Sequence, residues 1–289
     1  MKTYIKIPFA ASFLVILMSC TGNISPLETL STFESYPLTQ GNTWNYQRSI
    51  NFTNIHPTSL ASRFQDTLIT ENITVKSLGK YKLLGLFDTI LLTESLSDSF
   101  STSPRYIGQS YYANNEEGLF LHGYSGTGLS MPKSSGTSLQ LKGHIFRNIE
   151  ELLEYLEMNR LLSRPQRMDS IYLEVPPKKV IEYPIQIGHP WIYREAGDPF
   201  KIGKQFSGNA ISTVKAGTFI VYHLEWLYDL NNDGIWDEDI RIVDEYATIG
   251  MVQRTITVND IKITDEYLNV LGSYTYLEIS ELLNYTVRF

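Results

Sequence analysis

The stretch Tyr36–Gln47 reads YPLTQGNTWNYQ, and Tyr183–Arg194 repeats its pattern as YPIQIGHPWIYR. The proline of each copy fixes φ and ends the incoming segment, while the glycine permits the positive φ of a tight reversal. The Trp and the last Tyr are two residues apart, so on a strand they share one face. We expect each copy to open a β-unit whose core takes up both aromatic rings.

Two further markers recur in the same order after each copy. Segment 75–81 resembles segment 214–219, since both combine Val-Lys with a following Gly and an aromatic residue. Segment 112–120 resembles 246–252, since both give Tyr-Ala, a variable turn and Gly followed by apolar residues. Three matches in one order predict an internal duplication.

The rest of the chain favours strands and one helix. Most segments alternate between apolar and polar residues, and Tyr (19) and Phe (13) are plentiful, which is typical of β proteins. Asn148–Leu162 instead has apolar residues at helical spacing, with Asn148 as cap and Pro165 beyond its end. The fold class is therefore mainly β, with two related antiparallel β-units at 36–170 and 171–289 and one helix at 148–162. Glu174–Pro184, which holds three prolines, is expected to connect the halves.

The first nineteen residues have the features of an export signal. Lys2 and Lys6 precede the apolar run Ile7–Met18, which is too short to span a bilayer as a helix. The run ends in LMSC, Leu17–Cys20, which resembles the lipobox of bacterial lipoproteins, whose Cys becomes the acylated first residue. The alternative is an ordinary cleaved signal whose boundary happens to contain a cysteine. Cys20 is the only cysteine of the chain, so a disulfide framework is excluded and lipidation of Cys20 is its simplest use.

Lipidation would place the protein in the bacterial cell envelope, held on a membrane through acylated Cys20. Residues 20–35 are polar and are expected to form a tether. Removal of the signal takes away two lysines and no acid, so the formal charge of −7 becomes −9. This charge argues against nucleic acid as a partner, because nucleic-acid binding requires a basic surface. A protein, a glycan or a hydrophobic ligand remain open as partners.

Asp229–Asp239, DLNNDGIWDED, is the one candidate metal site. Its spacing matches positions of a calcium loop, which predicts a structural calcium ion as cofactor. The expected ligands are Asp229, Asn231, Asp233, Asp237, Asp239 and the backbone carbonyl of Ile235. The Glu that closes such loops at position 12 is absent, because Ile240 is there. The alternative is a plain hairpin turn at Asn232–Gly234.

The sequence contains no motif that assigns a reaction. No HExxH, P-loop or GxGxxG is present, and GYSGTG at Gly123–Gly128 lacks the last glycine of a nucleophile elbow. We therefore expect a binding or scaffolding module rather than an enzyme. A carrier of a hydrophobic ligand in a β-cavity and, less favoured, a carboxylate-based hydrolase are the alternatives. Trp44 and Trp191 are candidates for stacking on a carbohydrate, although core packing is the commoner fate of a strand Trp.

The chain also resembles a set of uncharacterised bacterial lipoproteins. Its segment Pro37–Tyr46 has their pattern PLxxGNxWxY, and it shares with them a GTF strand at Gly217–Phe219 and a Tyr-Ala…Gly strand at Tyr246–Val252. The resemblance covers most of the mature chain but rests on short motifs. It implies an exported β-rich fold and no known reaction.

Overall fold

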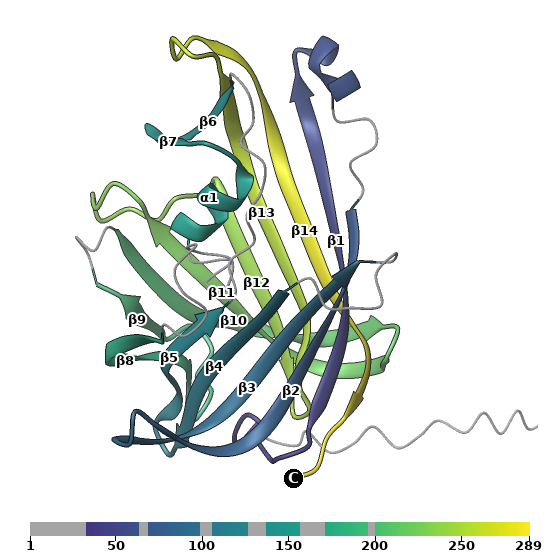
Figure 1. The fold of residues 1–289 in the computed structure, drawn as a ribbon, viewed down its shortest axis with the longest axis vertical. Coiled ribbons are helices and arrows are strands. Elements are labelled where there is room, and N and C mark those ends of the chain that lie inside the picture. Colours follow the sequence, from purple (N-terminus) through teal and green to yellow (C-terminus); the bar gives the residue numbers. More distant parts are fainter. Residues whose placement is uncertain (1–32, 64–68, 99–105, 127–136, 157–170, 196–199) are drawn as a thin grey trace, which may run out of the picture. The chain divides into compact units, whose positions relative to one another are not determined.

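The structure, a computed structural model, describes residues 33–63, 69–98, 106–126, 137–156, 171–195 and 200–289. The signal peptide, Cys20 and residues 157–162 of the expected helix lie outside these ranges. The described chain is mainly antiparallel β-structure with one α-helix, which confirms the predicted fold class (Figure 1).

The elements follow one another as long strands with a small insertion between β5 and β8. Their bounds are β1 Thr43–His56, the 3-10 helix η1 Thr58–Arg63, β2 Ile69–Leu83, β3 Phe87–Asp98, β4 Tyr106–Asn115, β5 Gly118–Gly126, β6 Ser138–Leu141, β7 His144–Phe146, α1 Ile149–Tyr155, β8 Tyr172–Glu182, β9 Pro190–Arg194, β10 Lys201–Val214, β11 Gly217–Asp229, β12 Ile240–Ala247, β13 Gly250–Thr264 and β14 Val270–Thr286.

The strands form one sheet in which almost every strand pairs with its neighbour in sequence. The order is β8-β5-β4-β3-β2-β1-β14-β13-β12-β11-β10-β9, with β6 paired to β13 and β7 to β6. The two ends of this path meet, because the indole N–H of Trp191 on β9 donates to the carbonyl of Lys179 on β8 at 3.0 Å. The sheet therefore curves around an interior, and alternate side chains of each strand point into it.

Two apolar clusters fill that interior. The entry core lies at the end where the described chain begins, and it includes Phe33, Tyr36, Trp44, Tyr46, Tyr183, Trp191, Phe206, Val252 and Leu282. The helix core lies toward the other end, and it includes Leu152, Leu153, Leu156, Ile202, Trp226, Tyr228, Ile242, Ile256 and Tyr276. Phe33, which the sequence analysis assigned to the tether, is buried in the entry core.

The helix α1 covers the second of these clusters. The side chain of Asn148 accepts a hydrogen bond from the backbone N–H of Glu151 at 2.9 Å, as expected of its capping position. Leu152, Leu153 and Leu156 are buried against the sheet. The space between helix and sheet is therefore packed with side chains along the described part of α1.

Both copies of the opening motif turn at their glycine in a similar way. Gly41 and Gly188 have φ of 89° and 80°, which glycine adopts without strain. The N–H of Gly41 donates to Ser77 on β2 at 2.9 Å, and that of Gly188 donates to Phe206 on β10 at 2.7 Å. The strand that carries the Trp of each motif pairs with β2 or with β10, and the glycine of that motif donates to the same partner strand.

The other two markers give a mixed result. Gly118 and Gly250 each begin the fifth strand of a run, at β5 and β13, so the two glycines have the same place in the strand order. Gly79 lies within β2 at a register shift, whereas Gly217 begins β11 after a turn, so this pair does not correspond. The expected connection Glu174–Pro184 is largely a strand, β8, which adds a sixth strand to the first run. The duplication stays a prediction, and superposing β1–β5 and β8 on β9–β14 is its test.

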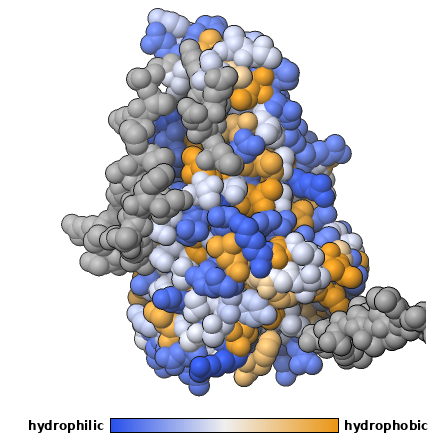
Figure 2. All heavy atoms as spheres, turned by 90° about the vertical axis from the view of Figure 1, so that its right-hand side faces the viewer, coloured by the Kyte–Doolittle hydropathy of each residue, from blue (hydrophilic) through white to orange (hydrophobic). Residues whose placement is uncertain are grey.

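The outer surface differs from the interior. On the face drawn in Figure 2, hydrophobic side chains lie in separate groups among hydrophilic ones. This mixture is expected where alternate strand residues face solvent. Within the described ranges, we find no helix with the length and hydrophobicity needed to cross a membrane.

Candidate ligand pocket and inner polar belt

Charged residues separate the two apolar clusters inside the sheet. On β1, Arg48 lies between Tyr46 of the entry core and Ile50, which packs on the helix core. On β13, Arg254 lies between Val252 and Ile256 in the same way. We call this layer the polar belt, and its members are Arg48, Glu71, Glu94, Lys204, Asp244, Arg254 and Glu278.

Two ion pairs neutralise most of the charge in the belt. Arg48 on β1 is paired with Glu71 on β2, through its Nε at 2.8 Å and also through its Nη2. Arg254 holds both carboxylate oxygens of Asp244, with Nε–Oδ1 at 2.5 Å and Nη2–Oδ2 at 2.8 Å. The Arg254–Asp244 pair is bidentate, and pairing of this kind compensates the loss of water around buried charges.

The charges of the belt determine the pKa of Asp244. Burial would raise the pKa of this carboxyl, but Arg254 outweighs burial and the pKa lies below its ordinary value. The indole N–H of Trp226 also donates to Asp244 at 3.0 Å. Lys204, which is fully buried, adds to this effect and lies with its Nζ 3.6 Å from the centre of the Trp226 ring.

Glu94 on β3 differs from the other acids of the belt. In the described part of the chain, no hydrogen bond or ion pair involves its carboxyl, whereas Glu71, Asp244 and Glu278 each have a partner. Its side chain and that of Arg254 retain partial accessibility because both line a pocket of about 140 Å³ between the polar belt and the entry core. The pocket thus presents one carboxyl without a partner to whatever fills it.

The pKa of Glu94 is raised, chiefly by burial. Arg48 and Arg254 oppose this effect, while Glu278 adds to it. The other six members of the belt are three basic and three acidic residues, so their charges cancel. A protonated Glu94 therefore leaves the net charge of the belt at zero. Glu94 therefore keeps its proton to higher pH than an exposed glutamate does, and it can donate a hydrogen bond while protonated.

The remaining walls combine phenol groups with apolar side chains. Burial raises the pKa of Tyr36 and of Tyr246, so both remain protonated at neutral pH. The hydroxyl of Tyr46 donates to the carbonyl of Met251 at 2.9 Å. Leu92, among other side chains, adds apolar surface. Such a lining suits a small amphipathic molecule, because apolar surface supplies affinity and a few polar groups supply orientation.

Glu94 is the only acidic residue among the described residues that line this pocket. A carboxylate-based hydrolase needs two acids on either side of the scissile bond. The other acids of the belt are engaged with basic groups or with a tyrosine hydroxyl. The geometry therefore favours binding over hydrolysis.

The two tryptophans proposed for carbohydrate stacking are both buried in the entry core. The indole N–H of Trp44 donates to the carbonyl of Ile249 at 2.6 Å, and that of Trp191 donates to Lys179. Their hydrogen bonds are satisfied inside the protein and their faces pack on other core residues. This placement matches core packing rather than stacking on a surface ligand.

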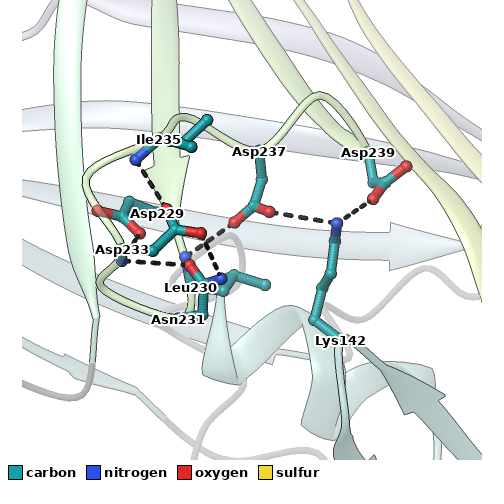
Figure 3. A network of polar contacts seen from close by, with 8 residues as sticks. All are labelled: Lys142, Asp229, Leu230, Asn231, Asp233, Ile235, Asp237 and Asp239. Carbon is teal, nitrogen blue, oxygen red and sulfur yellow. Dashed lines mark hydrogen bonds and ion pairs between the residues drawn. The ribbon is translucent and has the colours of Figure 1, made fainter.

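The aspartate-rich loop is held together by its own hydrogen bonds (Figure 3). The carboxylate of Asp229, which is buried, accepts from the backbone N–H groups of Asp233 and Gly234, both at 3.0 Å. Asp237 accepts from the N–H of Leu230 at 2.8 Å. Asn231 donates to Asp233 at 2.7 Å. The sequence thus brings the expected ligands into one loop.

Lys142 supplies the positive charge beside this loop. It lies in the turn between β6 and β7, and its Nζ is 2.5 Å from Asp239 and 3.3 Å from Asp237. The hydrogen bond that Lys142 donates to the carboxylate of Asp239 raises the pKa of Lys142. Ile235 is exposed, and its N–H donates to Asp233. Nowhere in the described ranges do three or more His, Cys, Asp or Glu side chains form a group suited to a metal. Calcium at this loop stays a prediction.

Glu94 and the rest of the polar belt were not predicted from the sequence, although their signal was present. Arg48 continues the inward-facing series of Trp44 and Tyr46, and Arg254 continues that of Val252. A charged residue at an inward position of an alternating strand is uncommon, because burying an unpaired charge is costly. Several such residues on different strands predict a buried network.

Comparisons with known proteins add little to this picture. Neither a protein-family model nor a curated protein matches the chain. One similar solved structure is that of a supposed exported protein with a YmcC-like fold from Bacteroides fragilis NCTC 9343, with 9% identity, a TM-score of 0.34 and coverage of 87% of this chain and 98% of that one. Another is a supposed lipoprotein from Parabacteroides distasonis ATCC 8503, with 10% identity, a TM-score of 0.33 and coverage of 87% and 97%. At TM-scores this low, neither match assigns a function to this chain.

Proposed function

We propose that this protein is a lipoprotein of the bacterial cell envelope, anchored through acylated Cys20, that binds a small amphipathic ligand in the pocket at Glu94. The observation that carries the binding role is the Glu94 carboxyl, which faces the pocket without a hydrogen-bond partner among the described residues. A partly buried carboxyl without a protein partner needs water or a ligand to satisfy its hydrogen bonds. The anchor rests on LMSC at Leu17–Cys20 and on the absence of any other cysteine.

The lining of the pocket narrows the class of ligand. Glu94 and Arg254 offer groups for hydrogen bonds, while Leu92 and Met251 offer apolar surface. A wholly hydrophobic cargo would leave Glu94 without a partner. The space beneath α1, where a hydrophobic carrier would hold its cargo, is filled by leucines. An amphipathic molecule, or the polar end of a larger one, therefore fits better.

The test is to ask what the protein retains when it is purified from its native membrane in mild detergent. Small molecules released by denaturation are compared by mass spectrometry among the wild type, Glu94→Gln and Asp88→Asn, an exposed acid on the same strand. We expect one compound that Glu94→Gln loses about tenfold or more, since hydrogen bonds to charged groups are worth about 1.5–3 kcal/mol. Asp88→Asn should retain it. If the wild type carries no compound that Glu94→Gln lacks, the pocket holds only water.

A further inference from the structure

The turn between β2 and β3 exposes an apolar tip, Leu84, Leu86 and Phe87. Leu84 and Leu86 are 56% and 72% accessible, and Phe87 is also exposed. The turn is closed by a hydrogen bond from the N–H of Leu86 to the carbonyl of Leu83 at 2.9 Å. Leu84 has φ of 49°, a conformation that favours Gly or Asn. The fold alone therefore gives no reason for leucine at this position, whereas a contact with an apolar partner does.

The tip lies at the end of the sheet where the described chain begins. Thr43, the first residue of β1, pairs with Lys76 of β2, and β2 continues past it to Leu83. The turn therefore extends beyond the start of β1. Figure 1 shows the β2–β3 connection at the same lower end as the start of β1 and the C-terminus.

The number of residues between Cys20 and Phe33 limits how far this end can lie from a membrane that holds Cys20. Phe33 is fixed in the entry core, and it follows Cys20 by thirteen residues. A chain of that length reaches at most about 45 Å when fully extended. An anchor at Cys20 therefore keeps the end that carries the apolar tip within this distance of the lipid surface.

The charges around the tip fit a phospholipid surface. Lys80 and Lys82 are exposed on the strand that leads into the turn, and Asp88, exposed on the strand that leaves it, has its Oδ1 4.0 Å from the Nζ of Lys82, so these three residues carry one net positive charge. The β13–β14 turn also exposes an apolar pair, Tyr267 and Leu268, but it follows Asp265 and Glu266. That turn lies at the other end of the sheet, because β14 pairs with β1 from Thr286 opposite Thr43 to Ser273 opposite His56. Basic residues beside apolar ones favour binding to anionic headgroups, whereas acidic residues oppose it.

We propose that the apolar tip inserts into the phospholipid leaflet that holds the acylated Cys20, so that the β-unit has a fixed orientation on the membrane. This inference rests on the anchor of the proposed function and is independent of ligand binding at Glu94. The tip supplies a second contact besides the acyl chains. Because the acyl chains hold the protein only at residue 20, a second contact of this kind fixes how the β-unit lies on the membrane.

The test uses the mature chain, residues 20–289, with Cys20→Ala, which carries no lipid, no apolar signal and no native thiol. A cysteine is introduced by Leu84→Cys or, as the matched control, by Leu268→Cys, and is labelled with a polarity-sensitive fluorophore. The two leucines are 56% and 52% accessible and both have positive φ. Vesicles of phosphatidylethanolamine and phosphatidylglycerol are then added, with phosphatidylcholine vesicles as the neutral comparison.

We expect a blue shift and a rise in emission at position 84 and no change at position 268. Lys80→Gln and Lys82→Gln should each weaken partitioning into the anionic vesicles about fivefold. Equal responses at both positions, or no response at position 84, would overturn the inference. The variant has no acyl chain, so these outcomes test the insertion of the tip alone. The anchor is tested separately, by the mass of the native N-terminus. Glu94→Gln should leave the response unchanged.

Discussion

At the scale of single residues, Glu94 is a carboxyl of the polar belt whose pKa lies above its ordinary value. Its pKa is raised in the folded protein, chiefly by burial, so the folded state holds a proton that the unfolded chain releases at lower pH. The stability of the wild type should therefore fall as the pH rises from the ordinary glutamate value of about 4.3 through the raised pKa. Above the raised pKa the penalty for burying the charge is fully present.

Glu94→Gln should remove this dependence. The variant should be more stable than the wild type at pH values above the raised pKa, and the difference should shrink toward acidic pH. The measurement is denaturant unfolding across a pH series, with Asp88→Asn as control, because Asp88 is exposed on the same strand. A difference that is constant across the series would show that Glu94 titrates as it does in the unfolded chain.

The two motif tryptophans are also distinguished at this scale. Both are buried in the entry core, and each donates its indole N–H to a backbone carbonyl. Trp44→Ala and Trp191→Ala should each lower the free energy of unfolding by about 3–5 kcal/mol. Thermal or chemical denaturation measures this loss. A cost below about 1 kcal/mol for either residue would point to a role other than core packing.

At the scale of elements, the loop between β11 and β12 and the turn between β6 and β7 act together. Asp237 and Asp239 are expected calcium ligands, and the Nζ of Lys142 already contacts both. Calcium must therefore displace Lys142 from these carboxylates. Because the closing Glu is absent and Lys142 competes, we expect a dissociation constant on the order of 0.1–1 mM.

A calcium titration followed by thermal unfolding tests this loop. At 1 mM calcium and a constant near 0.1 mM, binding would stabilise the fold by about 1.4 kcal/mol. Lys142→Gln should enlarge the calcium response, while Lys262→Gln, which breaks the nearby pair with Asp260, should not change it. Asp233→Ala should abolish the response. A melting temperature that ignores calcium up to several millimolar, roughly ten times the expected constant, would leave only a hydrogen-bonded turn.

At the scale of the whole molecule, attachment to the membrane depends on residue 20. Cys20→Ala should move the protein from the membrane fraction to the soluble fraction or leave its signal uncleaved, because acyl chains supply most of the attachment. Intact-mass analysis of the native protein should show a mature chain that begins at an acylated Cys20. A free N-terminus on the mature protein would contradict lipidation.

The sequence by itself predicted the antiparallel β-structure and the capped helix, because both depend on local features. Alternation with period two, turn glycines such as Gly41 and Gly188, and a cap at Asn148 act within a few residues of where they stand. The sequence also indicated that Trp44 and Trp191 each lie on the same strand face as the tyrosine two residues later. The sequence predicted a connection at Glu174–Pro184, where most of the segment is the strand β8. The composition of this segment does not indicate a strand, which becomes recognisable only through its pairing with β5.

Only the tertiary structure decided where the strands lie in the sheet and which charged groups meet inside it. Arg254 and Asp244 are ten residues apart and Arg48 and Glu71 twenty-three, and the belt forms because strand register places them at one level. Glu94 becomes a candidate ligand-binding group because the sheet closes around it without giving it a partner among the described residues. Such contacts depend on the register of each strand against its neighbour, and this register is not specified by residues close in sequence.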